Sequence, residues 1–131
     1  MQNSDANPQK TVRCQLLPRN ELATDQAVEV RLGDGDWPLR VIVVDVAGEL
    51  RIFRNRCPHL AWPLNVKPDA FLTADGQFIV CQGHGALFER GTGSCVAGPC
   101  RGQALRQYTA ATNSNGIIVA DVPVSDLPFQ S

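Results

Sequence analysis

The chain has 131 residues, 44% of them hydrophobic, and a formal net charge of −1 from 12 Lys and Arg against 13 Asp and Glu. This length provides one modest hydrophobic core and is too short for two. The balanced charge gives no clustered basic excess of the kind that nucleic-acid binding requires. No apolar run approaches the roughly 20 residues that span a bilayer. We therefore expect neither a nucleic acid nor a membrane as a partner.

The N-terminal segment Met1–Lys10 is polar and contains neither an apolar core nor a twin-arginine pair, so it is not expected to be a signal peptide. We expect residues 1–12 to form a flexible tail, residues 13–124 to form one domain and residues 125–131 to form a C-terminal tail. A cytoplasmic location follows from the same features.

Along the chain, hydrophobic residues repeat with the two-residue period of strands. Asn20-Glu21-Leu22 can form a helical turn at most. The run Val41–Val44 is typical of a strand covered on both faces. The predicted strands are Arg13–Leu17, Val28–Leu32, Leu39–Val46, Leu50–Arg54, Phe78–Cys81, Ala86–Glu89, Ala104–Thr109 and Ile117–Val122.

Two turns predict hairpins. Ala47-Gly48 predicts that residues 39–54 fold back on themselves. Asn115-Gly116 predicts a second hairpin between the last two strands, because type I′ turns need positive φ at both central residues. Short strands separated by Gly and Pro, without a sustained helical stripe, predict an all-β fold, a small antiparallel sandwich or barrel.

The five cysteines are the most informative part of the composition. An odd number argues against a complete disulfide framework, and a reducing compartment argues against any disulfide. Metal binding or catalysis is therefore expected. The chain has only two histidines, and each lies within three positions of a cysteine.

Two motifs each combine one thiol with one imidazole: Cys57-Pro58-His59 and Cys81-Gln82-Gly83-His84. A lone cysteine is often a buried apolar side chain, but two Cys–His pairs favour metal ligands. A zinc site is one alternative, although zinc fingers usually pair like ligands at wider spacing. A [2Fe–2S] centre, with two thiolates on one iron and two imidazoles on the other, fits the mixed pairs better. Each motif follows a predicted strand, so we expect the ligands to converge from the ends of neighbouring strands.

The segments around these motifs resemble those of the Rieske ferredoxins and of the related iron–sulfur domains of nitrite reductases and ring-hydroxylating oxygenases. The resemblance runs from about Arg13 to Val122. It is carried by Cys57–Leu64, by Cys81–Phe88, and by Gly98-Pro99 with Leu105 and Tyr108 after it.

The resemblance implies one [2Fe–2S] cluster held by Cys57, His59, Cys81 and His84. It also implies a Rieske-type fold of stacked sheets with two cluster-binding loops, and a loop at Gly98-Pro99 that covers the cluster. The two histidines would lie at the surface, form the electron exit and couple reduction to proton uptake at high pH.

One feature departs from the family. Twenty-one residues separate His59 from Cys81, more than is usual. The extra length falls in Asn65–Gly76, where Lys67-Pro68-Asp69 and Asp75-Gly76 predict turns. A few more loop residues cost little closure entropy, so the expected ligand set is unchanged.

The resemblance also predicts the reduction potential. High-potential respiratory members have a disulfide between the cluster loops, and Ser and Tyr hydroxyls that donate to sulfur. Trp62, Gly83, Ala86 and Phe88 occupy the corresponding positions here and supply none of these groups. Because fewer donors stabilise the reduced cluster less, we predict a potential at the low end of the Rieske range, roughly −150 mV.

The remaining cysteines and the tryptophans have less defined roles. Cys14 is predicted to be a buried core thiol. Cys95 and Cys100 could close a small loop if oxidised, although the compartment opposes it, and Cys100 could donate a weak S–H bond near the cluster. Trp37 and Trp62 are predicted to pack in the core or at its rim, although Trp62, inside the first cluster loop, could instead shield one side of the cluster or contact a partner.

The implied function is that of a one-electron carrier between a reductase and a terminal oxygenase or another redox enzyme. One alternative is the small subunit of a nitrite-reductase-like complex, and another is a structural zinc domain with two Cys and two His ligands. A 2-His-1-carboxylate iron site would need two more histidines, so we expect no catalysis by this chain alone.

Overall fold

The computed structural model describes residues 10–33, 36–58, 62–65 and 67–128, which form short strands and two 3-10 helices. The helices are η1 (Arg19–Glu21) and η2 (Val124–Asp126). No helix among the described residues is long and apolar enough to cross a membrane. The strands are β2 (Thr11–Pro18), β3 (Ala27–Leu32), β4 (Leu39–Val46), β5 (Glu49–Arg54), β6 (Phe78–Val80), β7 (Leu87–Glu89), β8 (Cys95–Ala97), β9 (Gln107–Thr112) and β10 (Ile117–Pro123).

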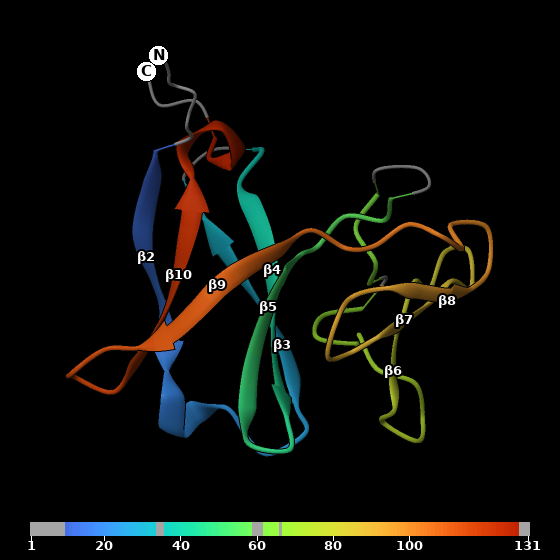
Figure 1. The fold of residues 1–131 in the computed structure, drawn as a ribbon, viewed down its shortest axis with the longest axis horizontal. Coiled ribbons are helices and arrows are strands. Elements are labelled where there is room, and N and C mark those ends of the chain that lie inside the picture. The colour runs from blue at the N-terminus through green and yellow to red at the C-terminus, as the bar shows by residue number, and fades with distance from the viewer. Residues whose placement is uncertain (1–9, 34–35, 59–61, 66, 129–131) are drawn as a thin grey trace, which may run out of the picture.

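The predicted all-β fold is confirmed, and it consists of two antiparallel sheets. Six strands form the larger sheet in the order β2-β10-β9-β5-β4-β3, and three form the smaller in the order β6-β7-β8. Figure 1 shows the small sheet as a separate lobe beside the large one, joined to it by the segments that follow β5 and precede β9. The chain therefore leaves the large sheet after β5, builds the small sheet, and returns through β9.

The strand β4 separates two hydrophobic clusters, as its apolar run predicts. Val41 and Val43 belong to a cluster with residues of β5, β9 and β10, whereas Ile42 and Val44 belong to a cluster with residues of the small sheet and both loops that carry the Cys–His motifs. All four side chains are fully buried. Because the alternating faces of one strand line both clusters, the small sheet is packed directly against the large one.

The prediction of a strand just before the last hairpin needs correction. The strand expected at Ala104–Thr109 is β9, which begins only at Gln107. Leu105 donates its N–H to the Gly93 carbonyl and packs in the cluster of the small sheet, whereas Tyr108 packs in the other cluster. The chain crosses between sheets at this point, so the two-residue period that suggested a single strand is interrupted.

The hairpin between β9 and β10 forms as predicted, but its turn is different. Of Asn115 and Gly116, only Gly116 has a positive φ, of 77°. The Gly116 N–H donates to the Asn113 carbonyl, and the Asn113 side chain accepts the N–H groups of Asn115 and Ile117. The turn is thus longer than the predicted two-residue type I′ turn, and Gly116 occupies its left-handed position. The short strand β8 was not predicted, because three residues carry too little periodicity.

A type I′ turn occurs instead between β4 and β5. Ala47 and Gly48 both have positive φ, of 52° and 94°. The Ala47 N–H donates to a carboxylate oxygen of Asp25 at 3.0 Å, which helps to hold the alanine in this conformation. The left-handed region costs an ordinary L-residue roughly 1–2 kcal/mol, so Ala47 is a strained position.

A buried carboxylate anchors the same turn. Asp45 is 1% exposed and accepts the N–H groups of Asp25 at 3.0 Å and Gly48 at 2.9 Å, and it pairs with Arg19. Burial by itself would raise the pKa of Asp45, but these hydrogen bonds and the guanidinium outweigh it and lower the pKa. The ionised form of Asp45 therefore stabilises the fold.

Ala47→Asn is expected to raise the free energy of unfolding by about 0.5–1 kcal/mol, because asparagine tolerates positive φ better than alanine. Urea denaturation measures the change. Ala74→Asn, at an exposed turn residue without positive φ, is the matched control. Equal effects of the two substitutions would contradict the assignment of strain to Ala47.

The free energy of unfolding is expected to fall as the pH drops from about 5 to about 2, because the folded Asp45 carboxylate resists protonation more than the unfolded one. Asp45→Asn should lower the stability at neutral pH and flatten this acid dependence, whereas Asp36→Asn, at an exposed aspartate, should leave it unchanged. Urea titrations across this pH range test the claim, and an Asp45→Asn protein with the full acid dependence would contradict it.

Candidate metal centre

A buried carboxamide fixes the first of the two loops that carry the Cys–His motifs. Asn55, directly after β5, is 4% exposed. Its amide nitrogen donates to Glu29 at 2.7 Å and to the Asn65 side chain at 2.9 Å, and its oxygen accepts the Leu64 N–H at 2.7 Å. One side chain thus holds both ends of the segment 55–65, and it ties that segment to β3.

The partner of Asn55 on β3 is an ionised glutamate. Burial alone would raise the pKa of Glu29, but the hydrogen bonds from Arg40, Asn55 and Arg31 outweigh it and lower the pKa. Arg40 forms an ion pair with Glu29 at 2.5 Å and also reaches the Asn65 side chain. The first loop is therefore anchored by charge-assisted hydrogen bonds, which are stronger than neutral ones.

The second loop is a tight connection between β6 and β7. The Cys81 N–H donates to the Ala86 carbonyl at 2.8 Å, and the Gly85 N–H donates to the Cys81 carbonyl at 2.7 Å. Gly85 has a φ of 74°, so the turn requires the left-handed backbone that glycine adopts without strain. This geometry orients Cys81 and His84 toward the same side of the loop.

One backbone hydrogen bond joins the two loops. The Gln82 N–H donates to the Leu64 carbonyl at 2.9 Å, and within the first loop the Cys57 N–H donates to the Trp62 carbonyl at 2.7 Å. The prediction that the ligands converge from neighbouring strands is wrong, because β5 and β6 belong to different sheets. Contact between the loops brings the two motifs together.

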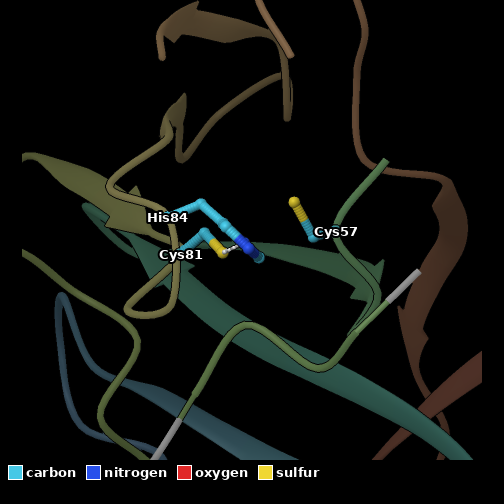
Figure 2. Close-up of side chains that lie close together, drawn as sticks. All are labelled: Cys57, Cys81 and His84. Carbon is cyan, nitrogen blue, oxygen red and sulfur yellow. Dashed lines mark hydrogen bonds between the residues drawn. The ribbon is translucent and has the colours of Figure 1, made fainter. Parts of the chain in front are cut away.

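Three of the four predicted ligands meet at this contact. The Sγ atoms of Cys57 and Cys81 and a ring nitrogen of His84 all lie within 4.8 Å of one another, and Cys81 Sγ is 3.8 Å from His84 Nδ1. Figure 2 shows Cys81 and His84 on one loop with Cys57 facing them from the other. Both cysteines are buried and His84 is exposed. His59 lies outside the described residues.

This donor set suits a metal centre with soft ligands. Thiolate and imidazole are the ligands of zinc and of iron–sulfur centres, whereas Mg²⁺ and Ca²⁺ prefer oxygen. Burial raises the pKa of Cys81, so the free thiol holds its proton at neutral pH. Metal binding at Cys81 therefore requires the release of that proton.

A third segment, which contains Gly98-Pro99, packs against the two loops. Gly98 has a φ of 97°, and a Cβ atom there would lie 2.7 Å from the Cα atom of Ala86. The thiol of Cys100 is buried 3.1 Å from that of Cys95 and also interacts with that of Cys57. Burial, followed by these two neighbours, raises the pKa of Cys100 to about 12. Cys100 thus remains a protonated thiol beside a candidate ligand.

Two of the sequence predictions outside the motifs are wrong. Cys14 is only half-buried, at the margin of the hydrophobic cluster that contains Val41 and Val43, rather than a core thiol. Trp37 and Trp62 are 87% and 65% exposed, so neither packs in the core. Both tryptophans instead offer apolar surface near the first loop.

The extra residues between the motifs have a structural role that the sequence did not reveal. Asp69, at a φ of 57°, accepts the N–H of Glu29 on the outer edge of β3, and Phe71 is fully buried in the cluster of the small sheet. The insertion therefore covers a sheet edge and adds to the core. The anchoring role of Asn55 and Asn65 was also missed, because a single asparagine carries no recognisable sequence signal.

The pattern of the Rieske [2Fe–2S] domain family matches residues 12–114. No curated protein matches the chain. Solved structures of similar fold include the terminal oxygenase of carbazole 1,9a-dioxygenase from Novosphingobium sp. KA1, with 20% identity and a TM-score of 0.70 over 88% of this chain and 31% of that one. They also include the Sphingomonas yanoikuyae B1 ferredoxin, with 24% identity and a TM-score of 0.66 over 86% of this chain and 100% of that one.

A chain from the complex of reduced oxygenase and oxidized ferredoxin in carbazole 1,9a-dioxygenase is also similar, with 16% identity and a TM-score of 0.66 over 91% of this chain and 98% of that one. The present chain thus spans about a third of the oxygenase chain and nearly all of the other two. At these identities the structures show a shared fold. Because the family pattern covers most of the sequence, the chain belongs to the Rieske [2Fe–2S] domain family, and this membership implies one [2Fe–2S] cluster.

Asn55→Ala is expected to lower the free energy of unfolding by about 2 kcal/mol, because it leaves buried partners in both anchored segments without hydrogen bonds. It should also reduce the iron retained per chain. Urea denaturation and iron analysis measure the two effects. Asn115→Ala, at an exposed turn, should change the stability by no more than about 0.5 kcal/mol. Wild-type stability and iron content in Asn55→Ala would contradict the anchoring role.

Proposed function

We propose that this chain is a one-electron carrier in which Cys57 and Cys81 hold one iron of the cluster while His59 and His84 hold the other. The observation that carries the proposal is the close approach of Cys57, Cys81 and His84, within 4.8 Å, in a chain of the Rieske family. The described donors fit this cluster, since two thiolates and an imidazole are three of its four ligands. When bound, the cluster supplies a couple that gains and loses single electrons.

The surrounding residues suit such a role. Cys57 and Cys81 are 0% and 1% exposed, so the protein excludes water from their sulfur atoms. The exposed ring of His84 supports an electron exit at this surface. We propose no catalytic step for this chain, because its two histidines are both assigned to the cluster.

The partners that we propose are a reductase as donor and a terminal oxygenase or another redox enzyme as acceptor. The support is the similarity to the Sphingomonas yanoikuyae ferredoxin over its whole length and to a chain of the oxygenase–ferredoxin complex over 98% of its length. We also propose a cytoplasmic location, where the neighbouring thiols of Cys95 and Cys100 stay reduced. Family membership favours the cluster over a structural zinc site.

The purified protein is expected to be coloured and to contain two irons per chain, with a visible absorption that bleaches on one-electron reduction. Cys81→Ser should lose the colour because it removes a thiolate. Cys14→Ser should keep the colour because Cys14 lies at the edge of the hydrophobic cluster on the other face of β4, away from the proposed ligands. Absorption spectra, metal analysis and a reductive titration test this. A colourless protein with one zinc per chain would refute the proposed carrier, since Zn²⁺ is d¹⁰.

The midpoint potential is expected near the low end of the Rieske range, roughly −150 mV. The side chains of Ala86 and Phe88 are fully buried and carry no hydrogen-bond donor, so they leave the reduced cluster less stabilised than donor side chains would. A potentiometric titration of the intact protein measures the value. A midpoint above about +200 mV, near the respiratory end of the range, would contradict the argument.

A further inference from the structure

Two hollows that share a wall lie beside the first loop. The larger, of about 380 Å³, is lined by Arg31, Arg40, Arg54 and Arg56 together with Trp37, Pro63 and other residues. The smaller, of about 200 Å³, is lined by Arg54, Arg56 and Arg106 with Cys57, Pro58 and Ala104. Arg54 and Arg56 line both hollows, and Cys57 forms part of the second.

The arginines of these hollows differ in how their charge is balanced. Arg31 and Arg40 pair with Glu29, and Arg106 pairs with Asp126. No ion pair or side-chain hydrogen bond joins Arg54 or Arg56 to another residue in the described part of the chain.

Of the residues that the structure describes, Asp36 is the one acidic residue that lines either hollow. With Glu29 and Asp126, which pair with arginines of the hollows, three carboxylates balance five guanidinium groups. The shared wall carries an excess of positive charge on a protein whose formal net charge is −1.

Exposed aromatic surface accompanies this charge. Trp37 lines the larger hollow and is 87% exposed, and Trp62, next to the lining residue Pro63, is 65% exposed. Tryptophan and arginine are the residue types most enriched among the energetically dominant contacts of protein interfaces. Two exposed tryptophans, beside two arginines that pair with no carboxylate among the described residues, thus have the composition of a docking surface.

We propose that Arg54 and Arg56, with Trp37 and Trp62 beside them, form a docking surface for an acidic redox partner whose carboxylates pair with the two guanidinium groups. The inference rests on the proposed carrier function and adds the chemistry of the partner. Arg56 immediately precedes Cys57, so a partner bound here lies next to a proposed cluster ligand. Planar guanidinium groups bind carboxylates in a bidentate manner, which fixes orientation as well as proximity.

The sign of the salt dependence tests the surface directly. The intact protein is reduced, and its reoxidation by the anion ferricyanide and by the cation tris(phenanthroline)cobalt(III) is followed by stopped-flow absorption. The net charge alone predicts repulsion of ferricyanide and a rate constant that rises with ionic strength. Attraction at Arg54 and Arg56 predicts that the rate constant falls instead, because local charges dominate within a Debye length of about 10 Å.

Matched substitutions locate the attraction. Arg56→Gln should lower the ferricyanide rate constant at least about twofold at low ionic strength and raise that of the cobalt cation, since the probes carry opposite charges. A change in driving force would move both rate constants in the same direction. Arg56→Lys, which keeps the charge, should retain most of the wild-type rate constant. Arg13→Gln makes the same change of charge at the Arg13–Asp121 pair, which joins β2 to β10, and should affect neither probe in this way.

A flavodoxin, an acidic protein with a one-electron flavin couple, serves as the protein probe. The rate at which reduced flavodoxin transfers an electron to the oxidised protein should fall as salt is added. It should also fall in Arg56→Gln but not in Arg13→Gln. Equal effects of Arg56→Gln and Arg13→Gln, or a ferricyanide rate constant that rises with salt, would overturn the docking surface while leaving the carrier function intact. A protein without the cluster's absorption would overturn both, and that spectrum is recorded first.

Discussion

The side chain of Asn55 is the contact on which the geometry of the candidate metal centre depends. It is buried, so water does not compete for its hydrogen bonds to Glu29, Leu64 and Asn65. The Leu64 carbonyl in turn accepts the N–H of Gln82 in the second loop. Each loop is thereby positioned through the same short segment, and the segment is positioned by β3. Cys57 and Cys81 approach each other because this chain of hydrogen bonds leaves little freedom to either loop.

The two sheets make this anchoring rigid. Strands of three residues, as in the small sheet, are too short to be stable alone, and they depend on packing against a larger surface. That surface is one face of β4, whose residues Ile42 and Val44 are fully buried against the cluster of the small sheet. The long insertion contributes Phe71 to the same cluster. The loops therefore emerge from a packed junction, which preorganises side chains for metal binding more effectively than free loops would.

The charge of the surface beside Cys57 differs in sign from the net charge of the protein. The formal net charge of −1 is a sum over the whole chain, whereas a partner within a Debye length responds to the groups that it faces. Arginines from β3, β4 and β5, from the start of the first loop and from the segment before β9 line two adjoining hollows, and Cys57 lines the smaller of these. Some are neutralised by Glu29 and Asp126, and the remainder give this surface a sign opposite to that of the whole molecule. The same positive charge near the centre stabilises the reduced, more negative cluster and so raises its reduction potential. The lack of hydrogen-bond donors at Ala86 and Phe88 has the opposite effect on the potential.

Local sequence patterns determined the all-β class, the bounds of β4 and the proximity of Cys81 to His84, because alternation, turn residues and short spacings are properties of adjacent residues. The crossing of the chain at Leu105, the support from Asn55, the exposure of Trp37 and the gathering of arginines were decided only by tertiary structure. Each of these depends on residues far apart in the sequence. Their encounter follows from how the two sheets pack, and no local pattern encodes it.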